Sequence, residues 1–396
     1  MRYPREWYQM LATIEHHFPD LRASQQRGLA LWVYGTFLAK SACQSSVIAA
    51  LATLATFYTL RQHLREWLFD GPDKATPCHP QLDVTLCFAP LLRWLLQLWQ
   101  RPELALAIDA TAHGEQTVAL VISVLYRGSA IPLAWQVLPA NRPGPWIPHI
   151  LRLLQLIAPQ LPPTMQVLVL TDRGLWSPRL WKQIRALGLH PLMRVKNNTS
   201  FQPHGGCRLP VHQLLPGPGY AWVGQGTAFK AKKLRQRGTL IVLWYQEQKA
   251  PWVVLRDLPP GEVGVCWYGL RVWIELGFRA LKGVGCHCQP TRRSDAARVG
   301  RHWLVLAVAT LYAFAYDTRV EDAEDLGVPP QRLRSPRPVP DRPRERRVSL
   351  LSKGVSCLVQ QFCRGRLWRR LWLMPELWPS PPPELRIIYH QVAYHA

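Results

Sequence analysis

The chain has 396 residues, enough for one large domain with appendages or for two to three ordinary domains. Hydrophobic residues make up 48% of it and 18 residues are tryptophan, which excludes a chain that is disordered throughout. Lys and Arg number 48 against 25 Asp and Glu, a formal net charge of +23. This excess favours a polyanionic partner, most often nucleic acid. A solubility device, or a GC-rich genome that favours Arg codons, is the alternative.

The cysteines and the N-terminus bear on the cell compartment. The nine cysteines contain no CxxC pair, and their odd number without an apolar signal core after Met1 favours reduced thiols. The longest apolar stretch, 303–315, is too short to cross a bilayer and predicts a buried helix. We therefore expect a cytoplasmic protein with no membrane partner.

Residues 1–95 are expected to form a helical N-terminal region. Apolar residues recur with helical spacing at 11–18 and again from 29 to 68, with almost none of the alternation that is typical of strands. A Gly- and Pro-containing break at 71–77 marks a boundary, after which 82–99 predicts one more helix.

From residue 104 the pattern predicts a mixed α/β sheet with helices on both faces. The expected elements are strands 104–111, 117–126 and 130–138, helix 147–158, strand 166–171, helix 178–187 and strand 190–196. Asp109 lies near the end of the first strand, and Asp172 directly follows the fourth. Ligands collect at the carboxyl ends of strands in open α/β sheets, so both acids are candidates for a site.

A β-rich insertion is expected at about 197–262, before a second apolar helix at about 298–316. Its β-like runs are 219–223, 227–233, 239–246 and 251–256. Eight basic residues and one acid, Glu247, fall within 196–250. Five exposed cations are expected near a hairpin tip, where they would bind DNA: Lys230, Lys232, Lys233, Arg235 and Arg237. Lysines that protect an edge strand from aggregation are the alternative.

The C-terminal region, 317–396, is expected to be a basic tail rich in Arg and Pro. Twelve Arg and Lys residues and two acids lie between 332 and 370, and prolines alternate with charged residues at 336–343. Such a segment buries too little apolar surface to order itself, so an extended linker is predicted. Trp368, Trp372 and Trp378 suggest a short folded patch beyond it.

Four polar residues form one stripe in the segment 268–282, which has helical character. At roughly 100° per residue, they project within an arc of about 60°. The four are Tyr268, Arg271, Glu275 and Lys282. A carboxylate flanked by a phenol and two cations is unusual for a plain amphipathic helix. It suits a metal site beside a phosphodiester backbone.

Asp109, Asp172 and Glu275 are therefore predicted to converge on one metal site. Taken singly, either aspartate is more often a structural cap at a strand end, and Glu275 a solvated helix residue. Together they supply the hard oxygen ligands that Mg²⁺ prefers. Two such ions about 4 Å apart activate the attacking oxygen and stabilise the leaving oxygen in phosphodiester chemistry.

The sequence resembles the DDE transposases of bacterial insertion sequences, and within them the branch with a Tyr-x2-Arg-x3-Glu-x6-Lys signature. Tyr268, Arg271, Glu275 and Lys282 keep every spacing of that signature. The segments 108–111 and 171–174, which carry the two aspartates, are similar to the first and second acidic motifs of the family. The resemblance covers about 104–316.

The resemblance implies an RNase H-like catalytic domain, 100–316, interrupted by the β-rich insertion. It implies that residues 1–95 help to recognise the terminal inverted repeats, and that Tyr268, Arg271 and Lys282 hold DNA phosphates near the cleaved end. The expected cofactor is two Mg²⁺ ions, with Mn²⁺ as a substitute, and the expected assembly is a homodimer on DNA in a bacterial, nucleoid-associated setting. An aromatic residue of the insertion would stack on a displaced base; the candidates are Trp222, Trp244 and Trp252.

Three functions remain open at this point. The first is a transposase that cleaves its element's ends and transfers the 3′-hydroxyl ends to target DNA. The second is an RNase H-like endonuclease without strand transfer. The third is a catalytically silent, transposase-derived DNA-binding protein.

Overall fold

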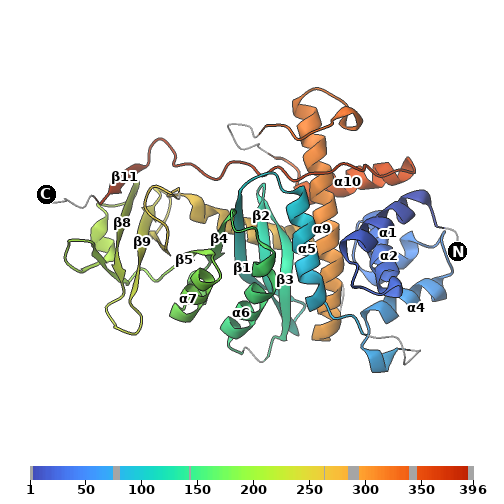
Figure 1. Ribbon diagram of the computed structural model, residues 1–396, viewed down its shortest axis with the longest axis horizontal. Helices are drawn as coiled ribbons and strands as arrows, with labels where there is room; N and C mark the ends of the chain where they lie inside the picture. The colour runs from blue at the N-terminus through green and yellow to red at the C-terminus, as the bar shows by residue number, and fades with distance from the viewer. Residues whose placement is uncertain are drawn as a thin grey trace.

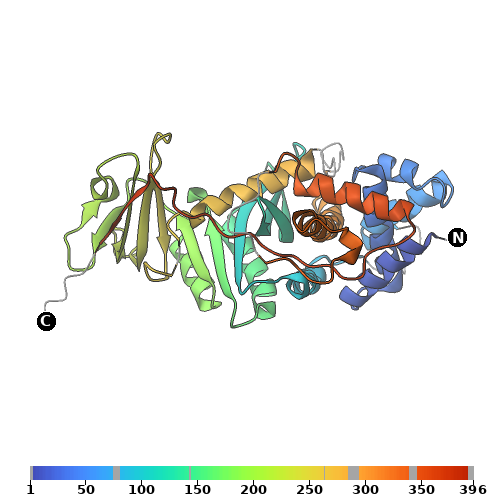
Figure 2. The ribbon, with the colours of Figure 1, turned by 90° about the horizontal axis from the view of Figure 1, so that it is seen from above.

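The computed structural model describes residues 3–74, 81–141, 144–262, 264–283, 294–338 and 346–390. The described chain is elongated, with helices at one end, a mixed sheet in the middle and a β-rich part at the other end (Figures 1 and 2). The helical end consists of α1 (Arg5–His17), α2 (Ala23–Ala39), α3 (Gln44–Ala50) and α4 (Phe57–Leu68). It packs on the rest through a continuous hydrophobic core.

Five strands form the central sheet. They are β1 (Glu103–His113), β2 (Thr117–Tyr126), β3 (Ser129–Pro139), β4 (Gln166–Thr171) and β5 (His190–Arg194). Their order is β3-β2-β1-β4-β5, with β1, β2 and β3 antiparallel and with β4 and β5 parallel to β1. The predicted mixed α/β fold with an RNase H-like sheet is confirmed.

Helices cover both faces of this sheet. They are α5 (Thr85–Leu98), α6 (Trp146–Ile157), α7 (Pro178–Ala186), α8 (Val272–Lys282) and α9 (Ala296–Asp325). Figure 2 shows α8, in gold, along one face and α6, in green, on the other. The long helix α9 packs against β3, α2 and α10 (Leu350–Cys363).

Helix α9 is the centre of the core. By length and composition it could cross a membrane, but its apolar window is entirely buried inside the protein, as expected of a core helix. The prediction of a buried helix is thus confirmed, and the helix extends beyond the predicted end at 316 to Asp325. Gly354 of α10 lies so close to it that an added Cβ would stand 2.0 Å from the carbonyl oxygen of Ala313.

The insertion prolongs the central sheet. Its strands are β6 (Ser200–Pro203), β7 (Leu209–Pro210), β8 (Tyr220–Ala228), β9 (Gln236–Trp244) and β10 (Trp252–Arg256). Because β10 pairs with β5, and β9, β8, β6 and β7 follow in order, the ten strands introduced so far belong to one continuous sheet.

The prediction of two strands at 219–223 and 227–233 is wrong, because one strand, β8, runs without a break from Tyr220 to Ala228 and ends there. The glycines suggested a break between them, but Gly226 serves a close approach of β6. A Cβ at Gly226 would lie 2.1 Å from the carbonyl oxygen of Gln202. Residues 229–235 form the loop that follows β8.

The C-terminal region differs from the extended linker that composition predicts. Glu321 of α9 accepts ion pairs from both Arg127 and Arg346 at 2.8 Å, and Arg346 also pairs with Glu376. Trp372 donates to Asp322 at 2.7 Å. Arg346 and Trp372 therefore attach the segment to α9, because Glu321 and Asp322 are buried acids on that earlier helix. Part of the Pro-rich run at 336–343 lies outside the described residues.

Past α10 the chain crosses the molecule in an extended form (Figures 1 and 2). Trp368 stacks on Tyr316 at 4.9 Å between ring centroids, and Trp378 lies edge-on to Trp267 at 4.6 Å. At the far end, β11 (Arg386–Tyr389) pairs in parallel with β8. The three tryptophans predicted to form one patch instead fasten this crossing segment at successive points.

Asp317 is a buried acid on α9 with an unusual charge balance. Its side chain is fully buried, and neither carboxylate oxygen has a hydrogen-bond partner among the described residues. Lys353 lies 3.9 Å away, which would favour the charged form, but Lys353 also pairs with Glu324 at 2.8 Å. Burial, reinforced by Glu321, dominates and raises the pKa of Asp317 to about 8.

We predict that Asp317→Asn removes a pH dependence of stability. The carboxyl binds its proton in the folded protein up to about pH 8, whereas in the unfolded chain it ionises near pH ~3.9. Its stabilising contribution is therefore complete below pH ~4 and is lost as pH rises towards 8, by at most about 1.4 kcal/mol per pH unit.

Urea unfolding between pH 4 and 9 measures this. The Asn variant should show a flatter profile and exceed the parent in stability above pH 8. The control is Asp325→Asn, which removes a partly exposed acid at the end of the same helix. Equal slopes for the parent and Asp317→Asn would show that the carboxyl is ionised in the fold.

Candidate active site

Asp109 lies on β1, and Asp172 directly follows the neighbouring parallel strand β4. In the β1–β4 pair, Ile108 stands opposite Thr171, so the next residue of each strand is at the same level. Because matched positions of paired strands share a face, both carboxylates lie on one face of the sheet. The predicted adjacency of these acids follows from parallel pairing between segments far apart in sequence.

Asp172 also has a structural task. Its Oδ1 accepts a hydrogen bond of 3.0 Å from the amide of Leu175 and caps the short 3-10 turn Arg173–Leu175. The capping role expected as the alternative is therefore present. It uses one of two carboxylate oxygens, so the same residue can also serve as a ligand.

Arg271 joins Asp109 to Glu275. Its Nη2 lies 2.9 Å from Oδ2 of Asp109, and its Nη1 pairs with Oε1 of Glu275. The Arg271 side chain is 13% exposed, whereas that of Glu275 is 53% exposed. Arg271 therefore pairs with Glu275 of α8 and also reaches across to the strand that carries Asp109.

The electrostatics of the cluster follow from this bridge. Burial raises the pKa of Asp109; Arg271 and the Ala110 amide oppose this shift, and the nearby charges of Asp172 and Glu275 add to it. Burial alone would lower the pKa of Arg271, but Asp109 and Glu275 outweigh it and raise that pKa. The partly buried acids thus require a cation, and the guanidinium supplies it.

The stripe of four residues is not one α-helical face. Trp267–Arg271 form a 3-10 helix, and α8 begins at Val272 with Arg271 as its N-cap. A 3-10 helix has about three residues per turn, so the projection that assumed 3.6 throughout is wrong for Tyr268. Glu275 and Lys282 do share α8, where both line one cleft.

Tyr268 is buried, with 4% of its surface exposed. Its hydroxyl donates a hydrogen bond of 3.2 Å to the carbonyl oxygen of Thr171, the last residue of β4. It therefore fixes the 3-10 segment against the strand end that carries Asp172. This placement disagrees with the predicted contact between Tyr268 and a DNA phosphate, which needs an accessible hydroxyl.

A cleft of about 470 Å³ opens beside the acids. Its lining combines two carboxylates with two cations: Asp109, Ala110, Thr111, Glu275, Phe278, Arg279, Lys282 and Gly283. Arg279 was missed in the sequence, although its position one helical turn after Glu275 could have shown that it lies on the same face. The cleft thus combines negative charge from β1 and α8 with positive charge from α8.

The three acids do not form a ready metal site in this arrangement. In the part of the chain that the structure describes, no group of three His, Cys, Asp or Glu side chains is placed to hold a metal. Asp109 is close to both other acids electrostatically, but Glu275 turns to Arg271. Arg271 thus acts as the counter-cation of Asp109 and Glu275 in this arrangement.

The five predicted basic residues lie on and beside the loop between β8 and β9, and all five are exposed. Phe229, at the start of this loop, stacks on Trp176 at 4.9 Å between ring centroids. Trp176 follows the turn that Asp172 caps. The basic loop is thus attached to the segment next to the second aspartate, as the hairpin-tip prediction requires.

The three tryptophan candidates differ in exposure. Trp222 is 5% exposed and packs edge-on against Phe201, so it is a core residue. Trp244 is partly buried and donates to the carbonyl oxygen of Gln248. Trp252 is also partly buried and lies 5.5 Å from the Tyr268 ring, which makes it the candidate nearest to the acids.

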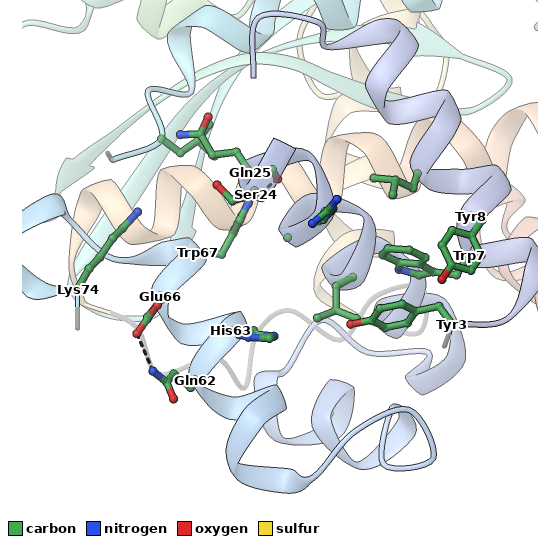
Figure 3. Close-up of a pocket in the computed structure, with 15 residues that line it drawn as sticks. Tyr3, Trp7, Tyr8, Ser24, Gln25, Gln62, His63, Glu66, Trp67 and Lys74 are labelled. Carbon is green, nitrogen blue, oxygen red and sulfur yellow. Dashed lines mark hydrogen bonds between the residues drawn. The ribbon is translucent and has the colours of Figure 1, made fainter. Parts of the chain in front are cut away.

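A larger cavity, of about 770 Å³, lies between the N-terminal helices (Figure 3). Tyr3, Trp7 and Tyr8 gather on one side of it, while Gln62 and Glu66 hydrogen-bond to each other on another. It contains no acid cluster, so the smaller cleft remains the better candidate for chemistry. Recognition of DNA ends by this helical region stays a prediction.

Residues 127–312 match the family model for the transposase DDE domain. No curated protein matches the chain. Among solved structures, the chain is similar to a piggyBac transposase, whose cryo-EM structure is a synaptic complex with hairpin DNA. That similarity has 10% identity and a TM-score of 0.41, and it covers 82% of this chain and 73% of the other.

The family match contains Asp172 and Glu275, whereas Asp109 lies upstream of it on β1, paired with β4 inside it. The signature residues Tyr268, Arg271 and Lys282 also fall within the match. Domains of this family act in DNA transposition and generally use divalent metal ions. The resemblance to DDE transposases is thus confirmed, and residues 127–312 of this chain are a transposase DDE domain.

Proposed function

We propose that the protein cleaves DNA at the ends of its own insertion sequence and transfers the 3′-hydroxyl ends into target DNA. One observation carries the proposal: Asp109, on β1 just upstream of the matched domain, adjoins Asp172 at the end of the parallel strand β4, while Glu275 faces Asp109 across a shared cation. The DNA partners would be the terminal inverted repeats and the target duplex, bound by a homodimer in the bacterial cytoplasm.

In their chemistry the three acids fit a divalent metal, although Arg271 occupies two of them in this arrangement. Asp109, Asp172 and Glu275 offer only hard carboxylate oxygens, which suit Mg²⁺ and also accept Mn²⁺. A guanidinium already bridges two of the three, so the cluster attracts a cation in this structure. When bound, two Mg²⁺ ions would supply charge stabilisation to the attacking and leaving oxygens.

The three acids would differ in how firmly the fold holds them. Asp109 and Asp172 are fixed on paired strands, whereas Glu275 is more exposed and reaches in from α8. Arg279 and Lys282 line the same cleft and would attract the phosphodiester. Tyr268 would hold the N-terminal side of α8 in place through its hydrogen bond to Thr171.

We predict that Asp109→Asn, Asp172→Asn and Glu275→Gln each abolish cleavage and leave DNA binding, measured without metal, largely intact, because the acids hold metal rather than phosphate. The substrate is a plasmid with the inverted repeats that flank the gene, assayed with Mg²⁺. Glu103→Gln, at the opposite end of the β1–β4 pair, is the matched control.

Three outcomes separate the candidate functions. Acid-dependent nicking followed by joining of the cut end to a second plasmid supports the transposase. Nicking without joining, under conditions that form the DNA complex, indicates an endonuclease. Binding without metal-dependent nicking in the parent protein would contradict the proposal.

We predict that Lys282→Ala weakens binding of end DNA and lowers the salt slope, d log K/d log[salt], by about 0.9, the value for one lost phosphate contact. Filter binding from 50 to 300 mM salt measures it. Lys182→Ala is the control, because Lys182 is an exposed lysine of α7 outside the cleft lining. Equal slopes for Lys282→Ala and the parent would assign Lys282 to a structural role.

We predict that neutralising the basic loop weakens end binding, with the largest loss at low salt, where phosphate contacts contribute most. The variant changes Lys230, Lys232, Lys233, Arg235 and Arg237 to Gln. The control neutralises four exposed cations that follow α10: Arg364, Arg366, Arg369 and Arg370.

A loss confined to the loop variant supports a DNA clamp beside the active site. Equal losses in both variants would indicate a general effect of net charge. If the loop variant binds and cleaves as the parent does, the loop is scaffolding.

A further inference from the structure

Arg271 occupies the oxygens that the proposed metal site needs. Its two terminal nitrogens engage Oδ2 of Asp109 and Oε1 of Glu275 at the same time. The side chain of Arg271 is mostly buried, and Arg271 is the N-cap residue of α8, the helix that carries Glu275. A cation is thus already present between two of the three proposed ligands.

Arginine and a divalent ion exclude each other at this position. Arginine stays protonated under all ordinary conditions, so it cannot yield by losing its charge. Asp109 is partly buried and needs a positive neighbour, whether guanidinium or metal. Binding of metal by both carboxylates therefore requires the Arg271 side chain to leave them.

A DNA phosphate is the anion that can receive the displaced guanidinium. Arginine pairs with phosphate through two parallel hydrogen bonds, as it does with carboxylates. Arg279 and Lys282 already make the adjoining cleft attractive to a phosphodiester. The Nε of Arg271 is buried and has no hydrogen-bond partner among the described residues, so the present pairing leaves one of its donors unsatisfied.

We propose that Arg271 is an exchangeable counter-cation that couples metal binding to DNA binding. Without DNA it neutralises Asp109 and Glu275 and keeps metal affinity low. With DNA it moves to a phosphate, the carboxylates become free, and Glu275 can turn towards Asp172. Coupling is reciprocal, so metal also strengthens DNA binding. This inference rests on the proposed metal-dependent function.

The test measures metal binding rather than activity. Mn²⁺ is titrated into the DNA-free full chain, and free Mn²⁺ is followed by electron paramagnetic resonance. Arg271→Gln should bind Mn²⁺ about tenfold more tightly than the parent, a typical size for coupling between sites. Arg271→Lys keeps the charge without the two-pronged geometry and should fall between them.

Arg279→Gln is the matched control. It removes the same charge from the same cleft without touching the bridge, since Arg279 is exposed and lines the cleft beside Glu275. It should change Mn²⁺ affinity much less than Arg271→Gln does. Equal gains in the two variants would mean that general electrostatics, not exchange at the bridge, governs the affinity, and would overturn the proposal.

A second arm uses a duplex that carries the flanking inverted repeats. With it, the parent should bind Mn²⁺ more tightly, while Arg271→Gln should show little further gain. If Arg271→Gln binds Mn²⁺ no more tightly than the parent without DNA, and thermal melting shows that its fold is intact, the exchange is refuted. If Asp109→Asn and the parent bind Mn²⁺ equally tightly with DNA present, the proposed metal site, and hence the proposed function, is wrong.

Discussion

Parallel pairing of β1 with β4 is the constraint on which the site depends. These strands lie far apart in the chain, and their register sets Ile108 against Thr171 and therefore Asp109 beside Asp172. A shift by one residue would turn one carboxylate to the other face of the sheet. The register is protected because both strands lie inside the sheet: β4 is buried from its second residue to its end, and β1 pairs with β2 on its other edge. The chemistry thus depends on the packing of a core that does not itself take part in it.

Two neighbouring acids are costly to ionise together, and Arg271 reduces this cost. Partial burial disfavours ionised Asp109, and the charges of Asp172 and Glu275 add to this effect. Arg271, at the start of α8, offsets it by bridging two of the acids. Tyr268 fixes the preceding 3-10 segment to the end of β4. The position of Arg271 is therefore set by contacts with the same strand that places Asp172.

The insertion and the C-terminal segment extend this arrangement in opposite directions. The insertion continues the sheet through β10, and its basic loop returns to the loop after Asp172 through the stack of Phe229 on Trp176. The C-terminal segment begins at the buried acids of α9 and ends as β11 on β8. Both ends of the molecule are thereby connected to the central sheet through ordered contacts in the described chain.

The sequence by itself determined the local features: the apolar strands that end in Asp109 and Asp172, the helix that carries Glu275 and Lys282, the buried helix α9 and the exposed basic loop. Periodicity and composition suffice there, because each feature depends on neighbouring residues. The sequence misplaced Tyr268 because one period was assumed across a 3-10 helix and an α-helix. The prediction of an extended C-terminal linker was wrong because Arg346 forms its ion pairs with Glu321 and Glu376 only in the folded chain. Only the tertiary structure decided that Arg271 bridges Asp109 and Glu275, since an ion pair between a strand and a distant helix depends on their packing and leaves no periodic signal in the sequence.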